Sequence, residues 1–272
     1  MFSKRIAILG GGNIGRALAN GFVRSGNYKP SQIYITRRQT KFLDKYKKQG
    51  FHITSDNLEA INNCKTIIIS VLPAQLTNLL DSVKHVIQPK KHNIISVITG
   101  VKSQDISDRL KSSVPVILAM PNTAVSIGES MTCLAGNGFP KKALNSAIKL
   151  FDNIGKTIVV KEEHMIASTA LCACGIAFFL RAIRAASQGG IQIGFHAEDA
   201  LKMAAQTARG AATLLLESEA HPESEIDRVT TPLGCTIAGL NMMEHEGFSS
   251  AMIKGLVTAG EKAESLFNNK KK

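Results

Sequence analysis

The chain has 272 residues, of which 44% are hydrophobic and 20% charged, as in a soluble globular protein with an ample core. Its net charge of +12 suggests nucleic acid, but the basic residues are scattered or lie in a polar helix (Lys41 to Lys48) and a tail (Lys270 to Lys272). No Trp and no nucleic-acid motif accompanies them, so we expect no nucleic-acid partner and only a mild attraction for small anions.

Targeting, membrane and metal signals are weak. No charged segment precedes a long apolar run at the N-terminus, so we expect no signal peptide. The apolar stretch from Met165 to Leu180 is too short to span a membrane and predicts a buried core helix. The five cysteines are odd in number and lack zinc-type spacing, which predicts reduced thiols, no metal and a cytoplasmic location.

A glycine-rich turn joins the first predicted strand, Ile6 to Leu9, to the first predicted helix. In the pattern G-x-G-x-x-G, Gly10 permits a tight turn, Gly12 admits a pyrophosphate, and Gly15 lets the helix lie close to the strand. The N–H groups at the helix start would face the phosphates, although such turns also close ordinary βα units. The predicted cofactor-binding residues of this turn are Gly10, Gly12, Asn13, Ile14 and Gly15.

The end of the second strand indicates which dinucleotide binds. Thr36 is followed by Arg37 and Arg38, and no acid occurs between Tyr34 and Phe42. An acid there would bind the ribose hydroxyl of NAD, whereas a basic residue binds the 2′-phosphate of NADP. These residues favour NADPH; the alternative is that the two arginines only begin an exposed helix.

Strands alternate with helices up to residue 161, and no convincing strand follows. The pattern predicts an α/β fold with a Rossmann-type, doubly wound, mainly parallel sheet in residues 1–161 and an all-α domain in residues 162–272. Further strands are expected at 51–54, 66–72, 94–98, 114–120, 131–135 and 157–160. Helices are expected at 163–188 and 197–219, with shorter ones on either side of Gly247. The apolar helices predict burial between subunits.

A second candidate site lies in the segment from Val229 to Leu240. Its Pro232 and Gly234 form a turn that brings Cys235 and Thr236 to a helix start, where N–H groups can hold a carboxylate. The alternative is an ordinary helix cap.

Four segments give the chain a family likeness: Gly10 to Gly15, Ala119 to Thr123, Ala205 to Thr207, and His221-Pro222 with Val229 to Leu240. On these it resembles the pyrroline-5-carboxylate reductases nearly from end to end. The resemblance implies an N-terminal NAD(P)-binding domain, a C-terminal dimerisation domain, and homodimers that often assemble into decamers.

The resemblance also implies site residues. Thr236 would meet the ring nitrogen of the substrate, while Gly234, Cys235 and Thr236 would hold its carboxylate. Glu162 or Glu163 would lie near the substrate. The implied cofactor-lining residues are Thr36, Arg37, Asn57, Ser70, Val71, Leu72, Pro73, Ile98, Thr99 and Gly100, to which Arg38 is added on the grounds of charge given above. Departures from the family pattern include Leu72 for lysine, Thr99 in an A-A-G turn, Cys174 and Ile176 for serine and proline, and Leu233 for glycine.

The implied function is reduction of 1-pyrroline-5-carboxylate to L-proline, the last step of proline biosynthesis, by hydride transfer from NADPH to the imine carbon. The departures keep two alternatives open: a reductase of a different cyclic imine, or a non-catalytic NADPH-binding oligomer. A β-hydroxyacid dehydrogenase shares the two-domain plan but needs a lysine on the first long C-terminal helix. Between Met165 and Leu180 there is none.

Overall fold

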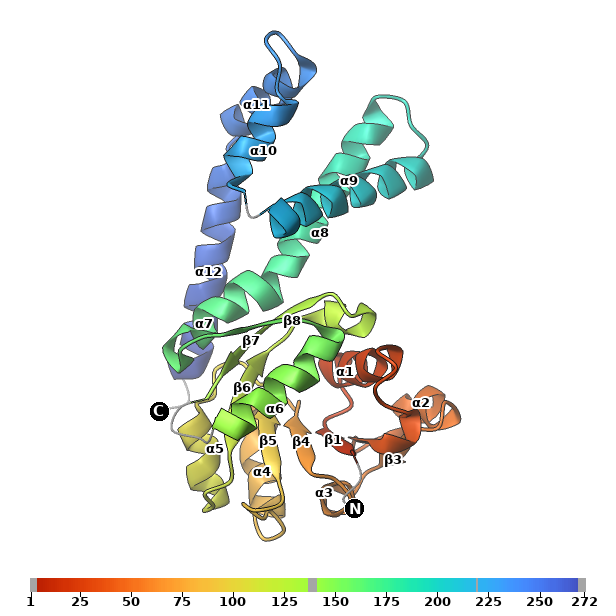
Figure 1. The fold of residues 1–272 in the computed structure, drawn as a ribbon, viewed down its shortest axis with the longest axis vertical. Helices are drawn as coiled ribbons and strands as arrows, with labels where there is room; N and C mark the ends of the chain where they lie inside the picture. The colour runs from red at the N-terminus through yellow and green to blue at the C-terminus, as the bar shows by residue number, and fades with distance from the viewer. Residues whose placement is uncertain (1–3, 137–140, 219, 269–272) are drawn as a thin grey trace. The chain divides into compact units, whose positions relative to one another are not determined.

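The computed structural model describes residues 4–136, 141–218 and 220–268 (Figure 1). By contacts the chain divides into two compact units, the first running to Cys174 and resuming at Ala259, the second from Gly175 to Thr258. The predicted boundary after residue 161, between a cofactor-binding domain and an all-helical domain, stays a prediction. The predicted basic tail, Lys270 to Lys272, and the predicted helix end at Glu219 lie outside the described residues.

The first unit is built on a sheet that contains eight strands within the described residues. They are β1 (Ile6–Leu9), β2 (Ile33–Thr36), β3 (His52–Thr54), β4 (Thr66–Ile69), β5 (Asn93–Ser96), β6 (Val116–Met120), β7 (Ser130–Ala135) and β8 (Gly155–Val159). Their order is β3-β2-β1-β4-β5-β6-β7-β8, and neighbours are parallel except β6 and β7. The predicted doubly wound, mainly parallel sheet is confirmed.

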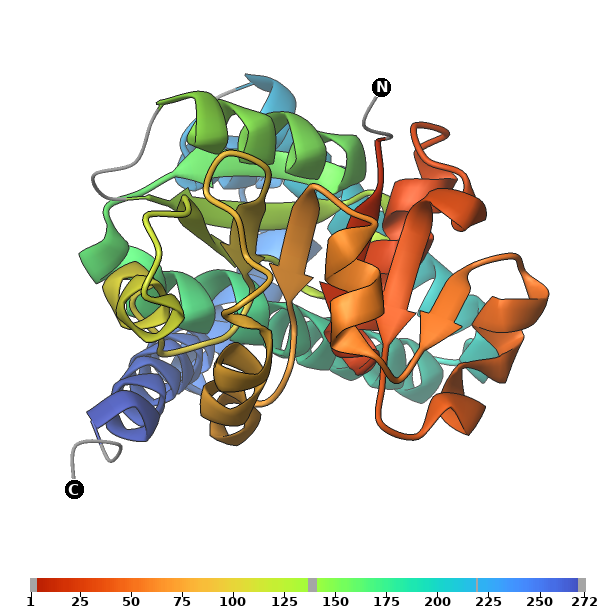
Figure 2. The same ribbon diagram turned by 90° about the horizontal axis from the view of Figure 1, so that it is seen from below.

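Helices cover both faces of this sheet (Figure 2). They are α1 (Asn13–Arg24), α2 (Asp44–Lys48), α3 (Asn57–Asn62), α4 (Pro73–Val83), α5 (Ser103–Leu110), α6 (Lys141–Phe151), α7 (Met165–Ser168) and the π-helical segment η6 (Thr169–Cys174). Short 3₁₀ turns join them: η1 (Pro30–Gln32), η2 (Thr40–Leu43), η3 (Thr123–Ile127), η4 (Asp152–Ile154) and η5 (Glu162–His164).

Two hydrophobic cores, one on each face, hold the sheet between these helices. Ile6 and Ile8 of β1 pack in the core that contains Phe22 of α1 and Phe151 of α6. Ala7 and Leu9 belong to the other core, with side chains of α3, α4 and α5. Because successive side chains point to opposite faces, a strand covered on both faces needs a continuous apolar run. This is why the strands were readable in the sequence.

The turn after β4 differs from the prediction, which extended this strand to residue 72. The strand ends at Ile69, and α4 begins at Pro73. The Ser70 hydroxyl donates to the Gly10 carbonyl at 2.7 Å, which draws the chain toward the glycine turn. Proline suits the first position of a helix, because its fixed φ is helical and its missing N–H would have no partner there.

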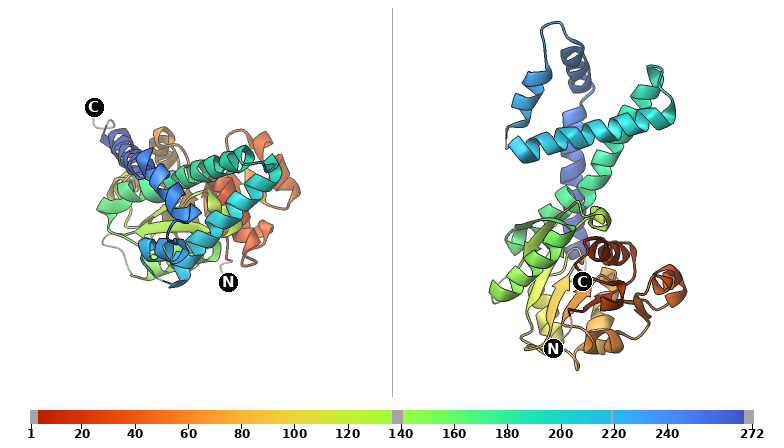
Figure 3. Two further views of the ribbon diagram at one scale, coloured as in Figure 1. Left: turned by 90° about the horizontal axis from the view of Figure 1, so that it is seen from above. Right: turned by 45° about the vertical axis from the view of Figure 1, so that its right-hand side comes forward.

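The second unit contains helices joined by turns, and no strand occurs among its described residues. It contains α8 (Gly175–Gln192), α9 (Ala197–Ser218), α10 (Pro222–Val229), α11 (Cys235–His245) and the start of α12 (Phe248–Asn268). The helices α8 and α9 form a hairpin (Figure 3), and a Cβ on Gly190 would lie 3.1 Å from that of Ala200. The single helix predicted for 163–188 is interrupted by η6 and continues to Gln192, and α12 is longer than predicted.

Apolar side chains of the second unit are mostly exposed. Among its described residues only Gly175, Ser187 and Ala200 are buried. The prediction of a buried core helix from Met165 to Leu180 holds only for its first part. Met165 and Ala170 are buried, whereas Phe179 and Leu180 are each 59% exposed in a single chain. The stretch 162–192 is long and apolar enough to cross a membrane, a weak indication because core helices of soluble proteins pass the same test. A surface this apolar indicates an interface.

Candidate cofactor and substrate site

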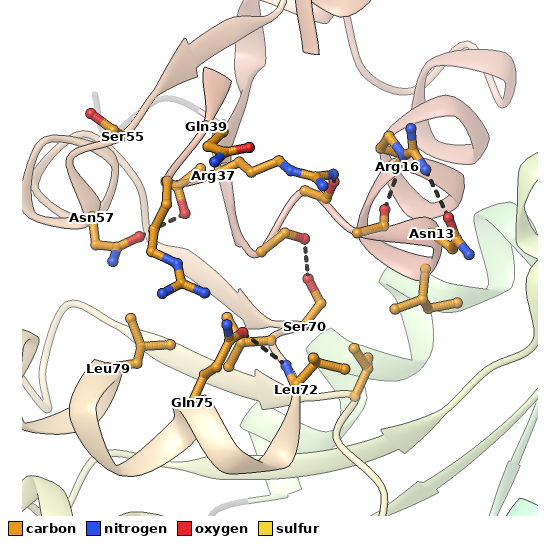
Figure 4. Close-up of a pocket in the computed structure, with 18 of the residues that line it drawn as sticks. Asn13, Arg16, Arg37, Gln39, Ser55, Asn57, Ser70, Leu72, Gln75 and Leu79 are labelled. Atoms are coloured by element: carbon orange, nitrogen blue, oxygen red, sulfur yellow. Dashed lines mark hydrogen bonds between the residues drawn. The ribbon is translucent and has the colours of Figure 1, made fainter. Parts of the chain in front are cut away.

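A cleft of about 1210 Å³ opens in the first unit at the carboxyl ends of β1, β2 and β4. Here the strand order reverses between β1 and β4, which is the usual ligand position in an open α/β sheet. Figure 4 shows side chains converging on it from α1, from the end of β2, from α3 and from α4. Of the predicted cofactor residues, Gly10, Gly12, Asn13, Ile14, Thr36, Arg37, Arg38, Asn57, Ser70, Val71 and Leu72 line it.

The glycine turn forms the floor of this cleft. Gly10 has a φ of +117°, and a Cβ there would lie 2.6 Å from the Ser70 carbonyl oxygen. A Cβ on Gly15 would lie 2.1 Å from the Gly10 oxygen, so Gly15 lets α1 pack against the turn without itself lining the cleft. Nothing lies within 4 Å of a Cβ on Gly12, which leaves backbone open to the cleft. These contacts fit a bound pyrophosphate.

The start of α1 is arranged for an anion. Gly12 is its N-cap and supplies no side-chain hydrogen bond, so the first N–H groups stay uncapped by a side chain. Arg16, one turn on, donates to Asn13 Oδ1 at 2.7 Å and to the Gly12 carbonyl at 3.2 Å, as Figure 4 shows. This arginine lines the cleft and was not predicted, although its place one turn into α1 is the signal that identifies it.

Two further arginines lie at the end of β2. The half-buried Arg37 donates through Nη1 to the Gly11 carbonyl at 2.8 Å, and its guanidinium carbon lies 4.5 Å from the centre of the Phe42 ring. Arg38 is exposed. Among the described residues that line the cleft three are arginine and none is acidic, so the local field favours a polyanion.

Asn57, the first residue of α3, is held at the end of β2 by a hydrogen bond to Thr36. The Thr36 hydroxyl donates to Asn57 Oδ1 at 2.6 Å, and Asp56 caps α3 by accepting from the Leu58 N–H at 2.8 Å. Other lining residues were missed in the sequence. They include Gln75, Asn78, Leu79 and Ser82 of α4, whose helical spacing could have identified them as one face.

The remaining predicted residues of the first unit lie elsewhere. Pro73 and Thr99 are not among the residues lining either cavity, whereas Ile98, Gly100 and Glu162 line a second cavity of about 490 Å³. Both carboxylate oxygens of Glu162 accept hydrogen bonds from Ser103, one from the N–H at 2.9 Å and one from the hydroxyl at 2.6 Å. Glu162 thus caps α5.

The predicted substrate turn lies in the second unit, between α10 and α11. Cys235 and Thr236 are the first two residues of α11, as predicted, and both are exposed. The N-cap, Gly234, supplies no side-chain hydrogen bond. Leu233 has a φ of +59° and is fully exposed, so a branched side chain occupies a left-handed position at this turn.

Comparison with known proteins identifies the family. A family model described as pyrroline-5-carboxylate reductase dimerisation matches residues 162–266, and one described as NADP oxidoreductase, coenzyme F420-dependent, matches residues 5–100. Pyrroline-5-carboxylate reductase 2 of Dictyostelium discoideum is 52% identical over 96% of this chain and 92% of its own length. The chain belongs to the pyrroline-5-carboxylate reductase family.

Other members of the family agree with this assignment. Pyrroline-5-carboxylate reductase 1 of Dictyostelium discoideum is also 52% identical over 99% of this chain, which spans 51% of that relative's length. The solved reductase of Coxiella burnetii is 30% identical with a TM-score of 0.85, covering 96% of this chain and 98% of its own. The Plasmodium falciparum reductase with NADP bound shares the fold at a TM-score of 0.88 and 22% identity, covering 98% and 99%.

Proposed function

We propose that the protein reduces 1-pyrroline-5-carboxylate to L-proline with NADPH, the last step of proline biosynthesis. The observation that carries this proposal is the cleft above the glycine turn, whose described lining residues include three arginines and no acid, in a chain of the pyrroline-5-carboxylate reductase family. In this proposal residues 1–161 bind the cofactor, and residues 162–272 supply the substrate turn and the dimer interface.

The cofactor supplies the hydride, and the chain holds and orients it. The N–H groups at the start of α1 take the pyrophosphate, with Gly12 allowing its close approach. The exposed Arg38 takes the 2′-phosphate, while Arg37 braces the turn through the Gly11 carbonyl and adds positive charge. Thr36 and Asn57, already paired, position the adjoining ribose.

The substrate half of the site is the turn before α11. The N–H groups of Cys235 and Thr236, at a helix start without a side-chain cap, hold the carboxylate, with Gly234 as the N-cap. The Thr236 hydroxyl oxygen accepts a hydrogen bond from the protonated ring nitrogen and helps to keep the imine protonated. Protonation makes the imine carbon a better hydride acceptor. Glu162 orders the second cavity through its two bonds to Ser103, and it lies near the substrate in this proposal.

The active form is a homodimer joined through the C-terminal helices, and dimers assemble further into a decamer. Support comes from the dimerisation model over residues 162–266 and from the exposed apolar side chains of the same helices. Burial by a second subunit also accounts for the apolar stretch 162–192 without a membrane. A cytoplasmic location and the absence of a nucleic-acid partner complete the proposal.

The test is NADPH oxidation by the purified protein, with and without 1-pyrroline-5-carboxylate, and with NADH in parallel. Saturable turnover that prefers NADPH supports the proposal, with proline identified as the product. Tight NADPH binding without turnover on any cyclic imine would overturn the catalytic proposal and favour a non-catalytic NADPH-binding oligomer.

A reductase of a different cyclic imine is the second candidate, and Leu233 favours it. This side chain projects from the substrate turn and is fully exposed. An apolar branched group at that position would narrow a pocket formed there and change which ring fits. Turnover compared across five- and six-membered cyclic imines, with and without a carboxylate, separates the two candidates.

A further inference from the structure

Two cysteines outside the proposed hydride chemistry face each other in the first unit. Cys133 lies in β7, and Cys172 lies in η6, 39 residues further along the chain. Their sulfur atoms are 3.7 Å apart. Cys133 is buried, and Cys172 is half-exposed, so the pair lies just below the surface.

The pair differs chemically from Cys64. A hydrogen bond from the Cys172 thiol to the Cys133 sulfur lowers the pKa of Cys133 and raises that of Cys172. Burial instead raises the pKa of Cys64 to about 12, which makes that thiol inert. The thiolate is the reactive form of cysteine, and a second sulfur within reach converts its first oxidation product into a disulfide.

The local backbone also favours a device of this kind. The segment η6 is π-helical, a geometry that occurs mostly as single turns within α-helices and frequently at functional sites. It is tied to the rim of the cofactor cleft, because Asn122 Nδ2 donates to the Cys172 carbonyl at 3.2 Å and the next residue, Thr123, lines that cleft. A covalent bond at Cys172 would therefore restrain backbone that contacts this rim.

We propose that Cys133 and Cys172 form a reversible disulfide when the protein meets a hydroperoxide. The Cys133 thiolate attacks a peroxide oxygen, so that an S–O bond forms, the O–O bond breaks, and hydroxide or alkoxide leaves. With the Cys133 charge gone, the Cys172 sulfur attacks the sulfenic sulfur. An S–S bond forms, the S–O bond breaks, and hydroxide leaves as water with the thiol proton. The two thiols lose two electrons, and the peroxide is reduced to water and an alcohol or a second water.

The geometry needs little change for this step. A disulfide has a sulfur separation of about 2.0 Å, so the two sulfurs approach by about 1.7 Å. Cys172 lies in the π-helical segment that joins α7 directly to α8. The product fixes η6 to β7 next to the boundary at which the first unit ends.

The test treats the full chain with one equivalent of hydrogen peroxide, blocks remaining thiols, and maps peptides by mass spectrometry. The expected product is a cross-linked peptide joining Cys133 to Cys172, lighter by two hydrogens and reversed by dithiothreitol. Hydrogen exchange should slow in Thr169–Cys174 of the oxidised protein only. In Cys172→Ser the expected product is a sulfenic acid at Cys133 that dimedone captures.

Cys174→Ser is the matched control, since it removes a thiol two residues away and should leave the cross-link intact. Oxidation of the exposed Cys235 confirms that the peroxide is active. The proposal is overturned if Cys235 is oxidised while Cys133 and Cys172 stay reduced, or if the cross-link is lost in Cys174→Ser. None of these measurements depends on turnover, so the proposed reductase activity and the disulfide succeed or fail separately.

Discussion

Thr236 is an exposed residue at the second position of α11, where a hydroxyl and backbone N–H groups lie together. Hydride transfer asks for orientation more than for a nucleophile, so the important side chains are those that hold charge or share a hydrogen bond. The two residues expected to do this most directly are Thr236 for the substrate and Arg38 for the cofactor.

Thr236→Val keeps the shape of the side chain and removes its hydroxyl. We expect a lower kcat/KM, corresponding to a loss of about 1.5–4 kcal/mol of transition-state stabilisation. The affinity for NADPH should be unchanged. Steady-state kinetics with NADPH fluorescence titration measure both. Cys235→Ala keeps the backbone N–H groups and should retain activity within about twofold, because side-chain loss alone removes no proposed contact. Unchanged kinetics in Thr236→Val would contradict the assigned role.

Arg38→Gln removes the charge proposed to meet the 2′-phosphate. The lost charge-assisted hydrogen bonds are worth about 1.5–3 kcal/mol, so KM for NADPH should rise about 10- to 100-fold while KM for NADH changes little. Arg37→Gln should weaken binding of both cofactors, and NADPH more, because Arg37 also holds the Gly11 carbonyl. Equal weakening of NADPH and NADH in Arg38→Gln would count against 2′-phosphate recognition.

At the scale of elements, the predictable parts of the fold were those whose side chains are buried on both sides. The run Ile67 to Ile69 predicts a strand because each residue packs in one of the two cores. The π-helical turn at η6 left no sequence signal, since its apolar residues satisfy an ordinary helix equally well. The antiparallel pairing of β6 with β7 was not identified either, because the apolar pattern of a strand does not indicate the direction in which the strand runs. In the site, the glycine turn and Arg37 were predicted, whereas Arg16 and the α4 residues were missed. Helical spacing shows which α4 residues share one face, but it does not show that this face meets the cleft.

The turn between α10 and α11 carries backbone strain at Leu233. A non-glycine residue in the left-handed region costs about 1–2 kcal/mol. In a single chain the Leu233 side chain is fully exposed, so no packing energy offsets this cost. Leu233→Gly should therefore raise the unfolding midpoint by a few degrees, measured by calorimetry. Leu233→Ala keeps a Cβ in the same conformation and should leave the midpoint near that of the natural chain. An equal rise in both variants would rule out backbone strain as the cause.

His92 lies between α4 and β5 and makes stability depend on pH. Its Nδ1 accepts from the Gln88 N–H at 3.0 Å, and desolvation by burial lowers its pKa to about 4. The unfolded chain binds a proton at His92 near pH 6.5, and the folded chain binds it only near pH 4. The contribution of His92 to the free energy of unfolding is therefore complete above pH 6.5 and is lost as pH falls from 6.5 to 4.

The expected loss from His92 is about 2–3 kcal/mol of unfolding free energy between pH 7 and pH 4. His92→Asn, which keeps an acceptor for Gln88, should show a flatter dependence in urea denaturation across this range. The exposed His85→Asn is the control and should follow the natural chain. Identical pH profiles for His92→Asn and the natural chain would exclude His92 as the source.

At the scale of the whole molecule, the second unit buries almost none of its apolar side chains within one chain, so its stability belongs to the assembly. Leu216 is 76% exposed on α9, within the segment matched by the dimerisation model. Leu216→Glu would place an unpaired charge in the proposed interface at a cost of about 3 kcal/mol or more, which is more than a hundredfold in Kd.

Analytical ultracentrifugation of Leu216→Glu should therefore show dissociation at concentrations where the natural chain is a dimer or larger. Turnover should fall with it if the assembled form is the active one. The control is Lys48→Glu, which also introduces a glutamate at an exposed helical position, on α2 of the first unit. It should leave the sedimentation coefficient unaltered. A dimer that survives the change in Leu216 would place the interface elsewhere on these helices.

The helix α12 begins in the second unit and ends in the first, where Gly260 lies against Ala170 and Ala263 is buried. A ribosome completes residues 1–174 well before it supplies this packing partner. At about 5–20 residues per second, the intervening stretch from Gly175 to Thr258 takes on the order of 4–17 s to synthesise. During that time the nascent first unit lacks the helix that packs on Ala170 of η6. Early folding therefore leaves Ala170 without this packing partner, and open to chaperones, until translation reaches α12.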